Sequence, residues 1–139
     1  MSNDNTIIAC EQAVRRFFQA LDNQDFPTCA SLMAPDGVWY RKGNPLVGRD
    51  AVRADLSVRG PEVVTAHLVT NCVVTPASTV AADVRYHALV YRCDNHVGPA
   101  GTPAPLGAPV SILFYEDLLV LIDGQWLVLE RRSRRIFAS

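Results

Sequence analysis

The spacing of hydrophobic residues predicts two helices at the start of the chain. In the segment 7–21, apolar side chains recur every three or four positions and form one stripe: Ile7, Cys10, Val14, Phe17, Phe18 and Leu21. We expect a helix over 7–21, preceded by a polar tail at 1–5. Helical spacing resumes after residue 25 and predicts a second, short helix over 27–34. Proline is tolerated in its first turn, and Pro35-Asp36-Gly37 is turn chemistry that ends it.

The remaining pattern is dominated by β-branched and aromatic residues and predicts strands. A first strand is expected over 37–41, followed by a turn over 42–45 and a third helix over 50–58, which Gly60-Pro61 ends. Four longer segments then have strand composition: 63–75, 79–93, 110–122 and 125–136. Asp123-Gly124 between the last two is a strong hairpin signal. This order predicts an α+β fold with helices gathered on one face of a curved sheet.

One connection differs from the rest of the chain. Residues 94–109 are rich in glycine and proline and have no strand or helix pattern. Long loops in compact domains are usually functional or mobile. Three interpretations stay open: a mobile hairpin tip, a flap over a pocket, or an arm onto a neighbouring subunit. No other segment resembles a domain boundary, so we expect a single domain over 1–139.

Composition excludes several classes of function. The chain has 139 residues, a net charge of −1 and 49% hydrophobic residues. A near-neutral charge does not favour a nucleic-acid partner, and no apolar run is long enough to span a bilayer. The polar N-terminus does not resemble a secretory signal, and the four scattered cysteines lack zinc-site or disulfide-scaffold spacing. We therefore expect a cytoplasmic protein with reduced thiols and no metal. A charged fraction of 19% leaves room for a self-association surface.

Four sequence segments resemble the NTF2-like superfamily, in particular its SnoaL-like and scytalone-dehydratase-like members. They are ALDNQDFPTCASLMAPDGVWY at 20–40, LVGRDAV at 46–52, TAHLVTN at 65–71 and DGQWLVLERR at 123–132. The resemblance implies an NTF2-like (cystatin-like) cone, in which a curved, mostly antiparallel sheet wraps around three N-terminal helices. It also implies an apolar pocket for a small molecule, no cofactor, and a homo-oligomer, either dimer or trimer.

The resemblance points to an acid–base pair. Alternation places His67 on one face of its strand together with Thr65, Val69, Asn71 and Val73. In the similar dehydratases a histidine at this phrase points into the pocket, and an acid at the position of Asp22 reaches it. Such a carboxylate would fix the tautomer of His67 so that its other nitrogen takes a proton. The alternative is that Asp22 caps the corner and His67 is a satisfied core histidine.

Further candidates follow from the same alignment. Tyr40 matches a tyrosine that polarises the substrate carbonyl, or else it is an aromatic wall residue. Trp39 should point the opposite way and serve packing or an interface. The other pocket candidates are Asn71, Tyr86, Arg92, Tyr115 and Asp117. Arg92 stands where the dehydratase has a second histidine, and Leu113 and Tyr115 stand where it has serine and asparagine, so scytalone is not the expected substrate.

Two titratable residues and one charged segment each have two interpretations. Asp117 is either a pocket acid or an ion-pair partner of Arg131 or Arg132. His87 is expected on the outer face of its strand, in a structural or interface role rather than as a second acid. The run 131–135 is expected to be a solvated or interface strand end rather than an anion site, because it has no interleaved aromatic residues.

Two functions remain open. The first is a cofactor-free dehydratase or isomerase that uses Asp22 and His67 on an apolar carbonyl or polyketide-like substrate. The second is a non-catalytic ligand binder or an accessory subunit, like the small subunits of ring-hydroxylating dioxygenases in this superfamily. The incomplete second half of the dehydratase site favours the second function.

Overall fold

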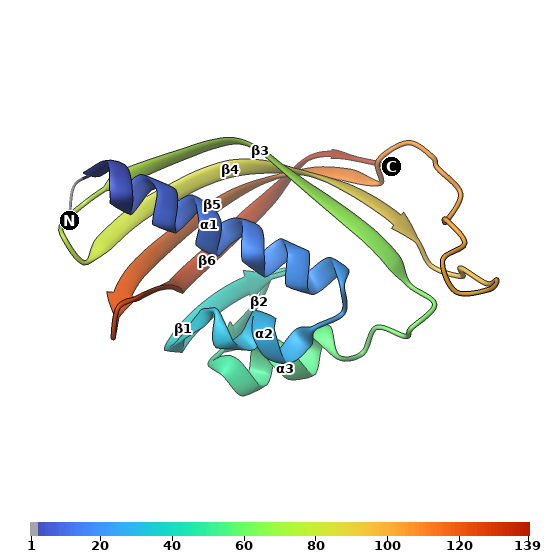
Figure 1. Cartoon of the computed structure of the whole chain (residues 1–139), viewed down its shortest axis with the longest axis horizontal. Coiled ribbons are helices and arrows are strands. Elements are labelled where there is room, and N and C mark those ends of the chain that lie inside the picture. The colour runs from blue at the N-terminus through green and yellow to red at the C-terminus, as the bar shows by residue number, and fades with distance from the viewer. Residues whose placement is uncertain (1–2) are drawn as a thin grey trace.

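A curved six-stranded sheet wraps around the N-terminal helix in the computed structural model, which describes residues 3–139 (Figure 1). The elements are α1 (Asn3–Asp22), α2 (Phe26–Ser31), β1 (Met33–Arg41), β2 (Asn44–Val47), α3 (Arg49–Leu56), β3 (Val64–Pro76), β4 (Ala81–Cys93), β5 (Ser111–Ile122) and β6 (Gln125–Ala138). The strand order is β2-β1-β6-β5-β4-β3, and only the β1–β6 pair is parallel. The predicted α+β class, with a curved and mostly antiparallel sheet, is confirmed.

The apolar stripe of α1 forms one side of the core. Cys10, Val14, Phe17, Phe18 and Leu21 are all at most 2% exposed, as the helical spacing required. They pack against the inner faces of the long strands, where residues such as Val84, Leu119 and Val128 are equally buried. Burying each large apolar side chain contributes about 1.5–3 kcal/mol, so this contact holds helix and sheet together. Among the described residues, no helix is long and apolar enough to cross a membrane.

The N-terminal element boundaries differ from the prediction. Helix α1 begins at Asn3, so the tail prediction is wrong for residues 3–5, and residues 1–2 lie outside the described part of the chain. Helix α2 ends at Ser31 because Met33 already pairs with Val128 in the sheet. Tertiary pairing therefore overrides the helical spacing of its last residues.

The β1–β2 hairpin was not expected. The segment predicted as a turn over 42–45 contains a tighter turn at Lys42-Gly43, where φ is +52° and +79°. Positive φ at both central residues matches the twist of flanking strands, so Asn44–Val47 folds back onto β1 as β2. The short hairpin forms one edge of the sheet.

A bulge interrupts the alternation of β3. The pairing with β4 shifts register between Thr70 and Val73, and Asn71 adopts φ +52°. Beyond the bulge, Cys72 and Val74 turn inward while Asn71 and Val73 are exposed. The prediction that Asn71 and Val73 share the inner face with His67 is wrong, because a single extra residue reverses every following side chain.

A buried ion pair lies beneath α1. Arg131 is 0% exposed and donates to both carboxylate oxygens of Asp117, through Nε at 3.0 Å and Nη2 at 2.9 Å. Tyr86 donates its hydroxyl to the same carboxylate at 2.8 Å, and the guanidinium lies 4.1 Å from the Phe17 ring centroid. Burial alone would lower the pKa of Arg131, but the charge and hydrogen bonds of Asp117, together with Tyr86 and Tyr115, raise it. The expectation of a solvated strand end is therefore wrong for Arg131.

The ion pair yields a stability prediction. We expect Arg131→Met to lower the free energy of unfolding by about 3–5 kcal/mol, because it leaves the buried charge of Asp117 unpaired. Arg132→Met is the matched control, since Arg132 is an exposed neighbour that pairs with Glu130 and should change stability little. Urea unfolding at neutral pH measures both. Equal stability of the two variants would contradict a structural role for the pair.

Candidate functional site: a cavity beside Asp22 and His67

An open cavity of about 560 Å³ lies where the end of α1, strand β1 and the inner face of the sheet diverge. Its apolar wall includes Leu21, Trp39, Val90, Leu113 and Tyr115, and His67 lies at the same wall. The β1–β6 ladder ends at the pair Trp39–Arg131, so the strands separate beyond it and leave the space unfilled. A cavity of this size suits a small organic molecule.

Asp22 and His67 meet as the resemblance implied. The Nδ1 atom of His67 lies 2.6 Å from Oδ1 of Asp22, and the backbone amide of His67 donates to Oδ2 at 2.8 Å. The hydroxyl of Thr65 adds a third hydrogen bond, to Oδ1 at 2.8 Å. The carboxylate of Asp22 thus accepts hydrogen bonds from two positions on the same face of β3.

The hydrogen bonds determine the charge and the tautomer of the pair. Burial alone would raise the pKa of Asp22, but the His67 ring, its amide and the Thr65 hydroxyl together lower it below its ordinary value. Asp22 is therefore ionised at neutral pH and can only accept hydrogen bonds. Nδ1 of His67 consequently carries a proton, and in the neutral ring this leaves the lone pair on Nε2.

Hydrogen bonds at the corner after α1 fix the position of Asp22. The chain turns at Gln24, whose φ is +57°, and the side chain of Asp25 caps α2 by accepting from the Thr28 amide. The side-chain amide of Gln24 donates to the carbonyls of Gly60 and Val63, each at 2.9 Å. These bonds tie the corner to the start of β3 and keep Asp22 beside His67.

Trp39 and Tyr40 both lie at the cavity but differ in burial and in contacts. Trp39 is 2% exposed, packs on Phe17 and lines the cavity, in line with its expected packing role. Tyr40 also lines the cavity, but the guanidinium of Arg132 lies 3.8 Å from its ring centroid. Among the described residues, no contact joins Tyr40 to Asp22 or His67.

Tyr115 lines the cavity and contacts the same phenylalanine ring as His67. The Phe18 ring lies 5.2 Å from the His67 ring and 5.3 Å from the Tyr115 ring, so the two flank one side chain. Tyr115 stacks on Tyr86 with ring centroids 5.1 Å apart. Burial raises the pKa of Tyr115, so its hydroxyl stays protonated and can donate a hydrogen bond.

The other pocket candidates are not part of the cavity wall, with one exception. Tyr86 and Asp117 lie beneath the wall in the Arg131 ion pair, and Asn71 is exposed at the bulge. Arg92 does line the cavity, and it pairs with Asp94 at the start of the long loop. His87 lies on the opposite face from Tyr86, with its ring 5.2 Å from Phe114, as expected for a structural histidine.

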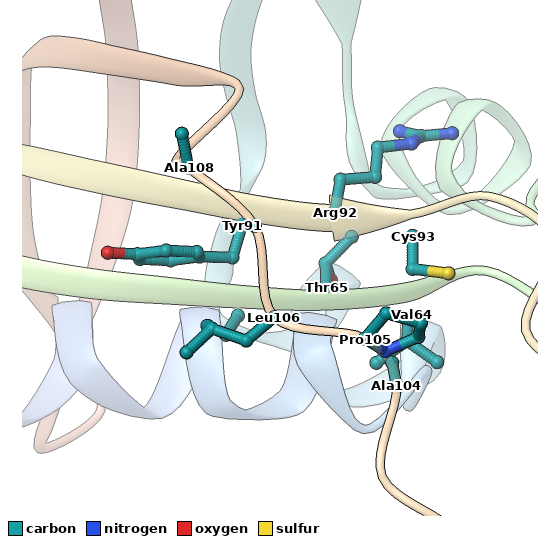
Figure 2. A pocket seen from close by; sticks show the side chains of 11 residues that line it. Val64, Thr65, Tyr91, Arg92, Cys93, Ala104, Pro105, Leu106 and Ala108 are labelled. Carbon is teal, nitrogen blue, oxygen red and sulfur yellow. The ribbon is translucent and has the colours of Figure 1, made fainter.

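The long loop covers the other face of the sheet. Figure 2 shows segment 104–108 running across β3 and β4, where it encloses a second cavity of about 360 Å³ with Val64, Tyr91 and Cys93. The loop base is held by His96, whose amide donates to the Glu62 carbonyl and whose ring contacts the Thr102 carbonyl. The loop therefore borders this second cavity and contributes no residue to the lining of the His67 cavity, and the three interpretations of the loop stay open.

Sequence reasoning missed two partners of the candidate pair. Thr65 precedes His67 by two residues and shares its face, so the alternation of β3 could have indicated that it reaches the same acid. Gln24 gave no signal, because its role depends on the backbone turn at its own position. Within residues 3–139, no group of three His, Cys, Asp or Glu side chains gathers as a metal site requires.

Comparison with known proteins identifies the family. The SnoaL-like domain profile matches residues 5–132, and no functionally curated protein matches the chain. Similar solved structures include a putative scytalone dehydratase from Novosphingobium aromaticivorans, which has 23% identity, a TM-score of 0.79, and coverage of 99% of this chain and 88% of that one.

Two further structures extend the likeness. An NTF2-like protein with a cystatin-like fold from N. aromaticivorans has 20% identity, a TM-score of 0.72, and coverage of 99% and 84%. A Catenulispora acidiphila protein in complex with S-DNPA has 24% identity, a TM-score of 0.73, and coverage of 95% and 94%. These likenesses show the fold. The chain belongs to the SnoaL-like domain family and has an NTF2-like, cystatin-like fold.

Proposed function

We propose that this protein binds an apolar, carbonyl-bearing small molecule beside His67 and moves a proton with the Asp22–His67 pair. The observation that carries the proposal is the 2.6 Å contact between Nδ1 of His67 and Asp22 at the wall of an open cavity. Reaction classes that fit are dehydration and isomerisation. The structure of a putative scytalone dehydratase of the same fold is consistent with this class, at 23% identity.

The chemistry follows from the tautomer. Nε2 of His67 takes a proton from the carbon next to the carbonyl, and the electron pair of the broken C–H bond forms an enolate. The ionised carboxylate of Asp22 stabilises the imidazolium that results. In an isomerisation the proton returns to another carbon. In a dehydration the enolate expels a β-hydroxyl group, which takes the proton from Nε2 and leaves as water.

A hydrogen-bond donor for the enolate oxygen is also needed. Both Tyr40 and Tyr115 line the cavity, and Tyr40 was the candidate from the resemblance. The contact of Tyr40 with Arg132 and the position of Tyr115 across Phe18 from His67 favour Tyr115. We therefore assign the donor role to Tyr115 and a wall role to Tyr40.

A non-catalytic ligand binder is the second candidate. It is favoured by the apolar character of the far wall, where Leu113 replaces a polar residue of the dehydratase site. An accessory-subunit role and a dimeric or trimeric assembly belong to the same alternative. Binding of small aromatic ketones with no proton transfer in the wild-type protein would favour it.

Removing either member of the pair should abolish proton transfer. We expect His67→Gln and Asp22→Asn each to slow the exchange of the α-protons of 2-tetralone in D₂O by about 10²–10⁴-fold, measured by proton NMR. His87→Gln is the matched control, because His87 lies on the outer face and should leave the rate unchanged. Wild-type rates in both pair variants would refute the assignment.

Removing the hydroxyl group of Tyr115 or of Tyr40 distinguishes the roles of the two tyrosines. We expect Tyr115→Phe to slow the same exchange by about 10²-fold, because the enolate loses its donor while the stacking on Tyr86 is kept. Tyr40→Phe should have little effect. A large loss in Tyr40→Phe with normal rates in Tyr115→Phe would restore the role that the resemblance assigned to Tyr40.

Asp22 should also make stability depend on pH. Its folded pKa is lower than the ordinary value of 3.8, so its stabilising contribution is present above pH 3.8 and is lost as the pH falls through the folded pKa. We expect the stability difference between wild type and Asp22→Asn to shrink as the pH falls below 3.8. Urea unfolding at several pH values measures this, with exposed Asp36→Asn as control. A difference that is constant with pH would contradict the expectation.

A further inference from the structure

The charged residues that line the cavity are mainly arginines and carry positive charge. Five arginines and one lysine contribute to its lining: Arg41, Lys42, Arg59, Arg92, Arg134 and Arg135. Among the described residues, no aspartate or glutamate lines it. Asp22 is not part of the lining and accepts three hydrogen bonds from His67 and Thr65. The cavity is therefore apolar on its inner wall and cationic around its mouth, although the chain as a whole has a net charge of −1.

Arg59 differs from the other cations of the lining because it is partly buried and has no ion-pair partner within residues 3–139, whereas the other unpaired cations, Lys42, Arg134 and Arg135, are exposed. Arg41 forms an ion pair with Asp55, and Arg92 forms one with Asp94. Arg59 has no ion-pair or hydrogen-bond partner for its guanidinium among the described residues, although it is only partly exposed. Burial and the nearby charges of Arg41 and Arg92 lower the pKa of Arg59, and Asp22 opposes this shift. Like charges thus crowd one another at the mouth.

The position of Arg59 is fixed by the same corner that places Asp22. Gln24 holds the carbonyl of Gly60, the residue that follows Arg59, and Asp22 is two residues before Gln24. The guanidinium of Arg59 and the acid of the candidate pair are thereby attached to one junction of the chain. An anionic group that neutralised Arg59 would relieve the crowding with Arg41 and Arg92 and would hold the rest of the molecule against the apolar wall.

We propose that the ligand of this cavity is an anion, whose carboxylate or phosphate-monoester oxygens bind Arg59 while its apolar carbonyl-bearing body lies along Leu21, Trp39 and Leu113. This proposal names the class of substrate for the same site, and it rests on the proposed function only for the reaction that the ligand undergoes. Arginine suits this role because its planar donors match two oxygen atoms of one oxyacid group. The arrangement puts the charge at the mouth and the reacting carbon near His67.

Binding of matched ligands tests the proposal without turnover. Isothermal titration calorimetry would compare 2-naphthoate, neutral 2-naphthamide and 2-naphthyl phosphate. We expect the wild-type protein to bind an anion at least about tenfold more tightly than the amide, because charge-assisted hydrogen bonds are roughly twice as strong as neutral ones. Tighter binding of naphthoate would assign a carboxylate ligand, and tighter binding of the phosphate would assign a phosphate monoester.

Variants assign the preference to Arg59. Arg59→Gln should reduce the anion-to-amide ratio to about threefold or less, while Arg59→Lys should keep part of it because the charge remains. Arg53→Gln is the matched control, since Arg53 is exposed on the helix that precedes Arg59. Failure of the wild type to prefer an anion, or to bind any of the three ligands, would overturn the proposal. A full preference in Arg59→Gln would do the same.

The failure of the reaction and the failure of this proposal are distinguishable. If His67→Gln and Asp22→Asn keep wild-type proton-exchange rates while the anion preference depends on Arg59, the proton-transfer assignment fails and the anion site stands. If both pair variants lose exchange while the wild type binds the amide as tightly as the anions, the reaction stands and the anion site fails.

Discussion

The three hydrogen bonds to the Asp22 carboxylate are the interaction on which the site depends. Asp22 is the last residue of α1, and the last turn of that helix contains no basic residue. A negative charge at a helix C-terminus is disfavoured by about 0.3–1 kcal/mol, because unsatisfied carbonyls give that end a partial negative charge. The donors on β3 offset this cost. The Asp22 carboxylate is therefore held in place by donors from a distant strand.

The interior divides into two parts with different polar groups. Beneath α1, Arg131, Asp117 and Tyr86 form a buried network in which the two charges pair, while Nη1 of Arg131 has no hydrogen-bond partner among the described residues. Toward the open end, His67 and Tyr115 keep hydrogen-bonding capacity at a cavity wall. This network supports Tyr115, because Tyr115 stacks on Tyr86 and Tyr86 donates to Asp117. The polar groups available for chemistry are therefore confined to the end where β1 and β6 separate.

The sequence pattern alone was sufficient to predict the class of fold, but not to predict which side chains line the cavity. Periodicity located the α1 stripe and the long strands, because those segments are buried along one face. The pairing of Asp22 with His67 came from the family resemblance. Asn71 was misplaced because a bulge leaves no mark in the hydrophobic pattern. The burial of Arg131 was missed because a charge run reads as solvated unless its partner across the sheet is known. Arg59 was passed over because only folding shows which arginines lack a partner.

The parallel pairing of β1 with β6 has a consequence for how the protein is made. Met33, Val38 and Trp39 of β1 pair with residues 128–131 near the end of the chain, and within residues 3–139 β6 is the long strand that β1 pairs with. During synthesis, the α1–α2–β1 segment must wait for nearly the whole polypeptide before its sheet partner emerges. Contacts between such distant segments carry a high loop-closure cost and slow folding. The edge of β1 that pairs with β6 therefore stays unpaired until β6 is made, and an unpaired strand edge is prone to aggregation until then.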